Sequence, residues 1–295
     1  MPEPAAHEPT FCYRHPSVET AVRCADCERP ICPDCMVFGP VGIRCPECAG
    51  HATNPIKAVR QAAPRPAQVR ALSRRDGIVT MSLIAVNVLV FLVQLAQSGS
   101  FRATGGEVVQ QGVLVGTAVD SGDWWRLVTS AFLHVNPIHL LFNLLMLYWF
   151  GRPLESFLGP WRFGAVYGLS ILAGAAGALL LTNPGTATLG ASGAVFGVLG
   201  AGLFLERRQG VYVFGGSALM VVVVNVIFSF TFSNISIGGH LGGLVGGLLA
   251  MIVLTRLGRV HAAYSRVTAE MVVGLLAIGV VSVIVAYLRV RGTAG

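Results

Sequence analysis

Charged residues are scarce in this 295-residue chain. Only 12% of its residues are Asp, Glu, Lys or Arg, whereas 54% are hydrophobic and the mean hydropathy is +0.67. An ordinary soluble domain is about one quarter charged, so the composition excludes that class and predicts a membrane protein. The 36 glycines agree with this prediction, because small residues let membrane helices approach closely.

Cysteine is absent after Cys48, so all seven cysteines lie near the N-terminus. This shift in composition predicts two joined parts. We expect a cysteine-rich cytoplasmic domain at residues 1–52 and a basic, proline-containing linker at 53–76. A membrane core with six transmembrane helices follows at 77–256, and residues 257–295 form a loop and one additional C-terminal transmembrane helix.

The net charge of +7 does not by itself indicate a nucleic-acid partner. Basic residues cluster directly before the first apolar stretch, where they are typical of a cytoplasmic flank that is attracted to anionic lipid. These residues are Lys57, Arg60, Arg65, Arg70, Arg74 and Arg75. No cleavable secretory signal is expected, because the first apolar stretch begins only near Gly77 and is long enough to span a membrane. The expected partner is the lipid bilayer, and no nucleic acid is expected.

The uncharged stretches predict seven transmembrane spans, since a helix needs about 20 apolar residues to cross a bilayer. A span at 77–101 comes first, and Asn136 with Pro137 begins a second that ends near Leu154. Two spans at 163–205 turn at Asn183 and Pro184, two at 209–255 are separated at 229–236, and the last covers 271–288. Residues 98–137 are too polar to span and should lie in the membrane interface. The predicted fold is an all-α polytopic membrane bundle.

Arginines predict the orientation of this bundle. With a cytoplasmic N-terminus, the cytoplasmic loops contain Arg152, Arg162, Arg207, Arg208, Arg256, Arg259 and Arg266. The opposite loops at 182–191 and 230–237 have no charge. This bias predicts a multi-pass protein of the cell membrane with its N-terminus inside. Arg289 and Arg291 would then lie outside, against the pattern.

The fourth predicted span contains no carboxylate before Glu206, and the sixth contains none. Four other polar residues stand out in the predicted spans. They are His139, Asn143, Ser192 and His240. A single such residue is most often an interhelical hydrogen bond, but four together favour a functional site. His139 and Asn143 share one helix face at i and i+4. Each of two predicted helices has a stripe of small residues that would let them pack closely. The stripes are Gly193, Gly197 and Ala201 beside Ser192, and Gly239, Gly243 and Gly247 beside His240. Close packing would pair the serine hydroxyl with a base.

These residues also carry a family resemblance. The chain contains, in this order, Trp-Arg at 125–126, His-x-x-x-Asn at 139–143, Gly-Ala-Ser-Gly at 190–193 and His-x-x-Gly-x-x-x-Gly at 240–247. Over roughly residues 78–256 the chain resembles the rhomboid family of intramembrane serine proteases. The resemblance implies transmembrane protein substrates, an active site that opens to the extracytoplasmic side, and six core helices plus one C-terminal helix.

The resemblance also implies a role for each site residue. Ser192 would attack the scissile carbonyl to form an acyl-enzyme, and His240 would take the serine proton. His139, Asn143 and the Ser192 backbone N–H would hold the oxyanion. Phe196 would pack against the ring of His240, at a position where the family often has tyrosine.

Other matching residues are expected to be structural. His134, Glu155 and Arg126 would act through packing or hydrogen bonds, with Arg126 anchoring the interfacial segment. The segment at 229–236 corresponds to the family's cap over the active site, and its uncharged sequence suits a mobile flap that admits water and substrate.

Eight candidate metal ligands form four pairs in the cysteine-rich domain: Cys12 with His15, Cys24 with Cys27, Cys32 with Cys35, and Cys45 with Cys48. Eight ligands match two tetrahedral zinc ions with no open position, so both are expected to be structural and neither to serve catalysis. An odd number of cysteines in a cytoplasmic segment argues against disulfides. The spacing resembles cross-braced B-box or RING-like modules. Pairing of adjacent couples stays an alternative, as does His51 in place of a late ligand.

The expected function of this zinc domain is protein binding or regulation through a cytoplasmic partner. Two alternatives concern the membrane part. One is a catalytically inactive rhomboid-like protein that binds or escorts membrane proteins, but the presence of both Ser192 and His240 argues against it. The other is a transporter, which would have polar residues along several spans rather than at one depth.

Overall fold

The structure, a computed structural model, describes residues 10–39, 42–49, 77–231, 236–256 and 267–293. The chain divides into two compact units, residues 1–71 and 72–295. The predicted linker at 53–76 and His51 lie outside the described residues.

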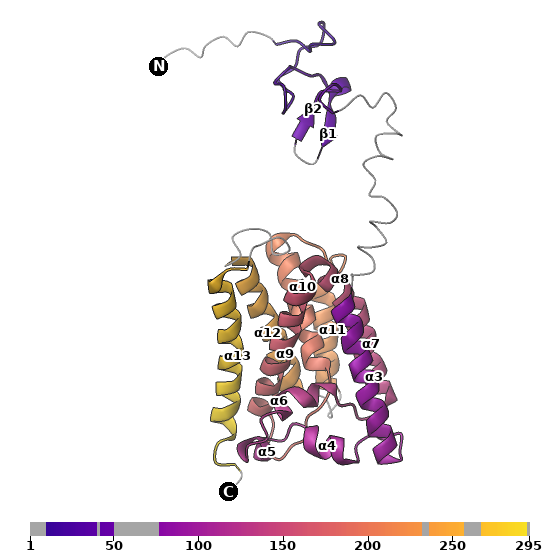
Figure 1. Cartoon of the computed structure of the whole chain (residues 1–295), viewed down its shortest axis with the longest axis vertical. Helices are drawn as coiled ribbons and strands as arrows, with labels where there is room; N and C mark the ends of the chain where they lie inside the picture. Colours follow the sequence, from indigo (N-terminus) through magenta and orange to yellow (C-terminus); the bar gives the residue numbers. More distant parts are fainter. Residues whose placement is uncertain (1–9, 40–41, 50–76, 232–235, 257–266, 294–295) are drawn as a thin grey trace. The chain divides into compact units, whose positions relative to one another are not determined.

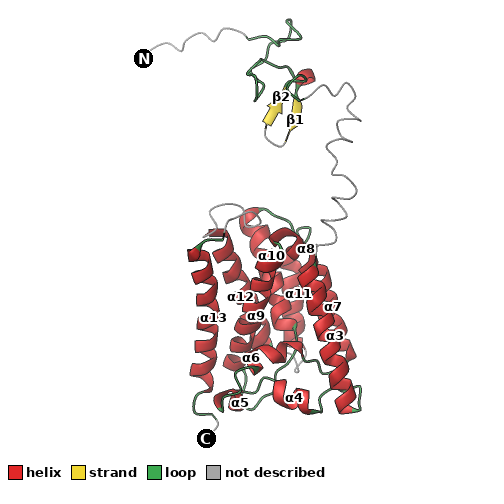
Figure 2. Cartoon of the chain, viewed as in Figure 1, coloured by secondary structure: helices red, strands yellow, loops and turns green. Residues whose placement is uncertain are grey.

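The N-terminal unit is a small fold with little regular structure (Figure 2). Strands β1 (Val37–Gly39) and β2 (Gly42–Arg44) pair antiparallel, and one 3₁₀ turn, η1 (Pro33–Cys35), precedes them. Its buried cluster consists of Cys12, Cys24, Ile31, Cys32, Cys35 and Cys45. Five of these six residues are cysteines, and so small an apolar core does not stabilise a fold without a further constraint. Metal coordination is the constraint that these cysteines can provide.

The second unit is a bundle of helices (Figure 1). The helices that form its length are α3 (Ile78–Ser98), α7 (Pro137–Met146), α8 (Arg152–Leu158), α9 (Pro160–Leu181), α10 (Ser192–Phe204), α11 (Ala218–Thr231), α12 (Ile237–Arg256) and α13 (Ala269–Val290). Two π-helical turns, η3 (Leu147–Gly151) and η4 (Leu205–Gln209), join α7 to α8 and extend α10.

Local signals in the sequence set several helix boundaries. Pro137 occupies the first turn of α7, and the Asn136 side chain accepts a hydrogen bond from the His139 N–H at 2.8 Å, as predicted for an N-cap. Gly159, with φ of +79°, makes the sharp turn between α8 and α9, and Pro160 begins the next helix.

Four of the described helices are long and apolar enough to cross a membrane by themselves: α3, α9, α12 and α13. The second predicted span corresponds to α7, η3 and α8, and it is bent by 97° from the short helices before Pro137. The fourth and fifth predicted spans correspond to α10 and α11, which have 13 and 14 residues. Helices therefore lie where all seven spans were predicted, but three are interrupted or shorter than expected.

Helix α12 lies between α9 and α10, and glycine makes this packing possible. A Cβ added to Gly247 would collide with the Gly197 carbonyl of α10, and one added to Gly177 of α9 would collide with the Gly238 carbonyl. The helix backbones thus touch directly, as the predicted small-residue stripes require. This contact brings α10 and α12, which carry Ser192 and His240, side by side.

The interfacial segment between α3 and α7 folds into short helices, as its polarity predicts. These are α4 (Glu107–Gly112), α5 (Gly116–Asp120), α6 (Arg126–Thr129) and the 3₁₀ turn η2 (Ser130–Phe132). They gather at one end of the bundle, the same end at which α13 finishes (Figure 1). The predicted cap at 229–236 is described only in part, because residues 232–235 lie outside the described ranges.

Candidate active site

Ser192 is the first residue of α10, and the loop before it is tightly held. The Gly190 N–H donates to the Ser130 carbonyl at 2.9 Å, and the φ of Gly190 is +127°, which L side chains rarely adopt. A Cβ at position 190 would also lie 2.8 Å from Cε1 of His139. Glycine is therefore required at position 190, and it leaves the approach to the first turn of α10 open, where backbone N–H groups have no helical partner.

His240 lies in the first turn of α12 and is 7% exposed. Its ring stacks on Phe196, with ring centroids 4.1 Å apart and planes at 17°. Phe196 comes one turn after Ser192 on α10, so the stacking holds the imidazole against the helix that begins with the serine. The structure thus brings the predicted aromatic partner and the predicted base together.

His139 and Asn143 both lie on α7, one helical turn apart. The His139 ring adjoins Gly190: an ideal Cβ at position 190 would lie 3.1 Å from His139 Nε2 and 3.8 Å from Ser192 Oγ. Asn143 is 6% exposed, and its Nδ2 donates to the His139 carbonyl at 2.9 Å. An amide Nδ2 has two N–H groups, so this bond leaves the second one for another acceptor.

Gln94 on α3 is part of this region and was not among the predicted site residues. Its side chain is fully buried and makes three hydrogen bonds: it accepts from the His134 N–H at 3.0 Å and donates to the carbonyls of His134 (3.1 Å) and Ala103 (2.8 Å). The ring of His134 packs on His139 with centroids 5.1 Å apart. An amide inside an apolar span was the available signal for Gln94, because such groups need a partner in the membrane.

Arg126 anchors the interfacial segment, as predicted. Its guanidinium pairs with Asp123 at 2.7 Å and donates to the carbonyls of Gln110 (2.7 Å) and Val113 (2.9 Å). These bonds tie α4, α6 and the turn between α4 and α5 to one cation. Arg126 is 8% exposed, and the three partners of its guanidinium all belong to the interfacial segment.

The four ligand pairs of the N-terminal unit form two clusters in the crossed arrangement. One cluster is Cys12, His15, Cys32 and Cys35, and the other is Cys24, Cys27, Cys45 and Cys48. Within each, the ligand atoms lie within 4.8 Å of one another. All seven cysteines belong to the described residues, and all are free of disulfides.

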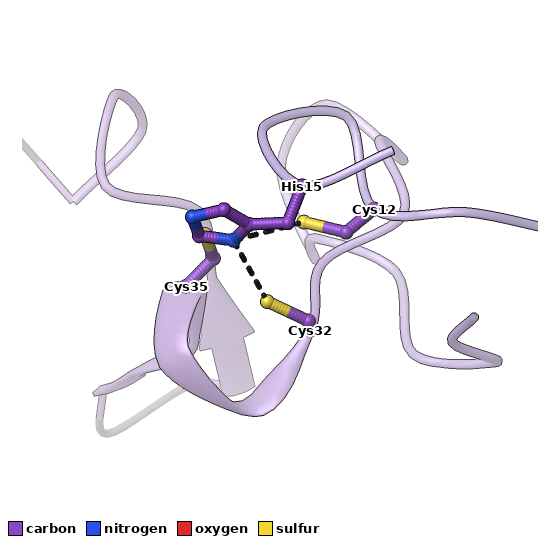
Figure 3. Close-up of side chains that lie close together, drawn as sticks. All are labelled: Cys12, His15, Cys32 and Cys35. Atoms are coloured by element: carbon purple, nitrogen blue, oxygen red, sulfur yellow. Dashed lines mark hydrogen bonds between the residues drawn. The ribbon is translucent and has the colours of Figure 1, made fainter. Parts of the chain in front are cut away.

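The distances in the first cluster fit a tetrahedral ion (Figure 3). Nδ1 of His15 lies 3.2 Å from Cys32 Sγ, 3.4 Å from Cys35 Sγ and 4.0 Å from Cys12 Sγ. Zinc bonds of about 2.3 Å to sulfur and about 2.0 Å to nitrogen place tetrahedral ligand atoms about 3.5–3.8 Å apart. The side chains already surround a space of the required size.

The thiol pKa values support the same conclusion. Burial acts to raise the pKa of Cys12, but backbone hydrogen bonds, first of all that of Cys32, outweigh it and lower the pKa to about 6. Burial and the neighbouring Cys12 and Cys32 thiols raise the pKa of Cys35 to about 12. One thiolate therefore forms readily, whereas several together need a cation to offset their repulsion.

Comparisons with known proteins bear on the membrane unit. A family model described as the rhomboid domain matches residues 121–257, which include His139, Asn143, Ser192 and His240. Rhomboid protease GluP of Bacillus subtilis (strain 168) is 33% identical over 178 residues, which cover 59% of this chain and 34% of GluP. YdcA of the same strain, whose name also contains the word rhomboid, is 37% identical over 134 residues, 44% of this chain and 67% of YdcA. Rhomboid protease AarA of Providencia stuartii is 24% identical over 205 residues, 59% of this chain and 71% of AarA. The match to GluP thus spans about a third of that protein's length.

Proposed function

The chain belongs to the rhomboid family, and we propose that it is an intramembrane serine endopeptidase that cuts membrane proteins in or near their transmembrane segments. The main support for this proposal is the stacking of His240 on Phe196, which lies one turn from Ser192. It keeps a buried imidazole beside the helix N-terminus that bears the hydroxyl. The chain is a multi-pass membrane protein, so the peptide bond it hydrolyses is expected to lie in or near the bilayer.

In the proposed reaction the Ser192 hydroxyl attacks the carbonyl carbon of the scissile bond. His240 accepts the hydroxyl proton as the new C–O bond forms, and the carbonyl electrons move to oxygen. When the C–N bond breaks, the imidazolium returns the proton to the leaving amine, which leaves an acyl-enzyme. Water, deprotonated by His240, then attacks the acyl carbon. The imidazolium returns this proton to the Ser192 oxygen as the C–O bond to the enzyme breaks, and the carboxyl product leaves.

The oxyanion would be held by three donors: the ring N–H of His139, the second amide N–H of Asn143 and the backbone N–H of Ser192. Donors that are fixed before the reaction stabilise developing charge at no cost of reorganisation. The fixed geometry around position 190, where His139 and Ser192 both adjoin one glycine, supports this assignment. Packing against Phe196 would orient His240, because neither α10 nor α12 contains a carboxylate that could do so.

We further propose that the N-terminus is cytoplasmic and that the active site opens on the opposite side. The arginine bias between the loops supports this orientation. The two ligand clusters would each hold one structural zinc ion. Four ligands per ion leave no position for a substrate or water, so catalysis would not depend on this metal.

A gel assay with the purified chain in detergent and a model transmembrane substrate tests the proposed function. We expect cleavage by the wild-type chain and none by Ser192→Ala or His240→Ala, with unchanged thermal unfolding of both variants. Turnover near the wild-type rate in either variant would exclude the dyad. A wild-type chain that binds the substrate without cutting it would favour the inactive, escorting alternative.

A further inference from the structure

The last turn of α13 is attached to the end of the bundle that carries Ser192. Ala286 and Val290 are 0% and 1% exposed, and they pack in one apolar cluster with residues of the interfacial segment and of α9. The cluster contains Leu114, Val119, Leu127, Ala175, Ala176, Ala178 and Leu179. Three segments that are far apart in the sequence therefore share one small core.

Polar contacts join the same three segments. The Thr293 N–H donates to the Asp120 carboxylate of α5 at 2.8 Å, and Arg289 donates to the Thr182 carbonyl at the end of α9 at 3.3 Å. The ring of Tyr287 lies 6.1 Å from that of Trp124, centroid to centroid. Arg289 was expected on the side of the membrane where the loops lack arginine. Its hydrogen bond to Thr182 gives it a structural contact at this end of the bundle.

The middle of α13 is less closely packed. An apolar groove of about 360 Å³ separates α13 from α9 and α12 there, and Ala277, Val281 and Val285 are among its lining residues. Arg289 in the last turn of α13 and Thr293 just after the helix both donate hydrogen bonds to other segments.

The segments held by α13 in turn hold the loop that leads to Ser192. Leu114 and Thr188 exchange backbone hydrogen bonds of 3.0 and 2.9 Å, and the Gly116 N–H donates to the Pro184 carbonyl at 2.7 Å. Gly190 is fixed by its bond to Ser130. Together with the Arg289 bond to Thr182, these contacts attach residues 182–190 at four points.

We infer that the last turn of α13, with Arg289 and Ala286, is a positioning element for catalysis that fixes the loop at 182–190 and thereby the place of Ser192. The catalytic part of this inference rests on the proposed function. Arg289 acts through the loop and does not touch the reacting atoms, so it is a positioning residue. The expected consequence of loosening it is a slower chemical step with unchanged substrate binding.

The test compares Arg289→Ala and Ala286→Leu with Leu288→Ala, all in the full chain purified in detergent. Leu288 lies in the same turn but is 53% exposed, so its truncation is the matched control. Arg289→Lys keeps a donor and a charge and serves as the conservative variant. Three quantities are measured: amide hydrogen exchange of residues 182–190, the rate of Ser192 labelling by a fluorophosphonate, and kcat and KM for a model transmembrane substrate.

For Arg289→Ala and Ala286→Leu we expect faster exchange at 182–190 and a labelling rate and kcat lower by about 10-fold, because misplacement of reacting groups by about 1 Å can cost up to about 100-fold. KM should stay at the wild-type value, Arg289→Lys should recover most of the rate, and Leu288→Ala should behave as wild type. Wild-type exchange and labelling in both Arg289→Ala and Ala286→Leu would overturn the inference. If Ala286→Leu does not fold, Arg289→Ala decides the question alone.

The exchange measurement also separates this inference from the proposed function. A wild-type chain that neither cuts nor takes up the label would refute the proposed protease. Faster exchange at 182–190 in Arg289→Ala would still support the attachment of the loop by α13, and unchanged exchange would refute it.

Discussion

Asn143 makes a structural hydrogen bond in addition to its proposed role as an oxyanion donor. One N–H of its amide donates to the His139 carbonyl at 2.9 Å, and this bond fixes the amide plane on the face of α7 that His139 shares. The other N–H is then held in one direction without further cost. An oxyanion donor needs this fixed orientation, because its contribution comes from being in place before charge develops.

Replacing Asn143 by alanine should lower kcat by about 100-fold and leave KM nearly unchanged, since one lost oxyanion donor costs about 100- to 1,000-fold in comparable hydrolases. Steady-state kinetics with a model substrate would measure this. Leu141→Ala is the control, because Leu141 lies on the same helix and is 54% exposed. A change in KM alone would mean that Asn143 binds substrate and does not stabilise the transition state.

At the scale of the helices, backbone contact replaces side-chain packing. The α9, α10 and α12 helices touch through glycines, and a Cβ at several of these positions has no space. Elsewhere in the bundle glycine is not needed for packing: at Gly164 and Gly168 of α9 no atom lies within 4 Å of an added Cβ. The sequence pattern predicted the close pair of α10 and α12, while the contact of α12 with α9 through Gly177 and Gly242 appeared only in the structure.

Gly247→Ala should therefore destabilise the bundle by about 1–3 kcal/mol, the usual cost of adding atoms to a packed interior. Thermal unfolding in detergent would measure the loss. Gly168→Ala is the matched control and should be neutral or slightly stabilising, because alanine favours helix over glycine by about 1 kcal/mol. Equal unfolding temperatures for the two variants would show that the backbone contact between α12 and α10 does not limit stability.

At the scale of the whole molecule, the proposed catalytic residues and the candidate metal ligands lie in different units. The four residues proposed for catalysis lie between His139 and His240, and the eight candidate metal ligands lie between Cys12 and Cys48. The N-terminal unit has too few buried apolar residues to fold without its ligand clusters. Its fold should depend on metal, whereas the bundle should not. A cytoplasmic protein partner for this unit stays a prediction.

The full chain should contain two zinc ions, and Cys24→Ser should lower the zinc content by at least one ion per chain and unfold residues 10–49. The same variant should cut a model substrate in detergent at the wild-type rate, because no proposed catalytic residue lies in this unit. Elemental analysis, exchange and the cleavage assay measure these outcomes, with Ser17→Ala, an exposed position, as the control. One zinc ion in the wild-type chain would contradict the assignment of ligands, and loss of cleavage in a folded bundle would contradict the independence of the units.

Features that depend on local composition and spacing could be predicted from the sequence. Apolar length located the helices, Asn136 and Pro137 marked the start of α7, and the ligand pairs and the ordered motifs predicted two metal clusters and the residues of the site. Three features required the three-dimensional structure: which ligand pairs share a cluster, that Gln94 binds the backbone of His134, and that the residues after α13 bind α5. Gln94 and His134 are 40 positions apart and Asp120 and Thr293 are 173 apart. Contacts over such separations depend on how helices pack in three dimensions, and no local pattern of residues specifies them.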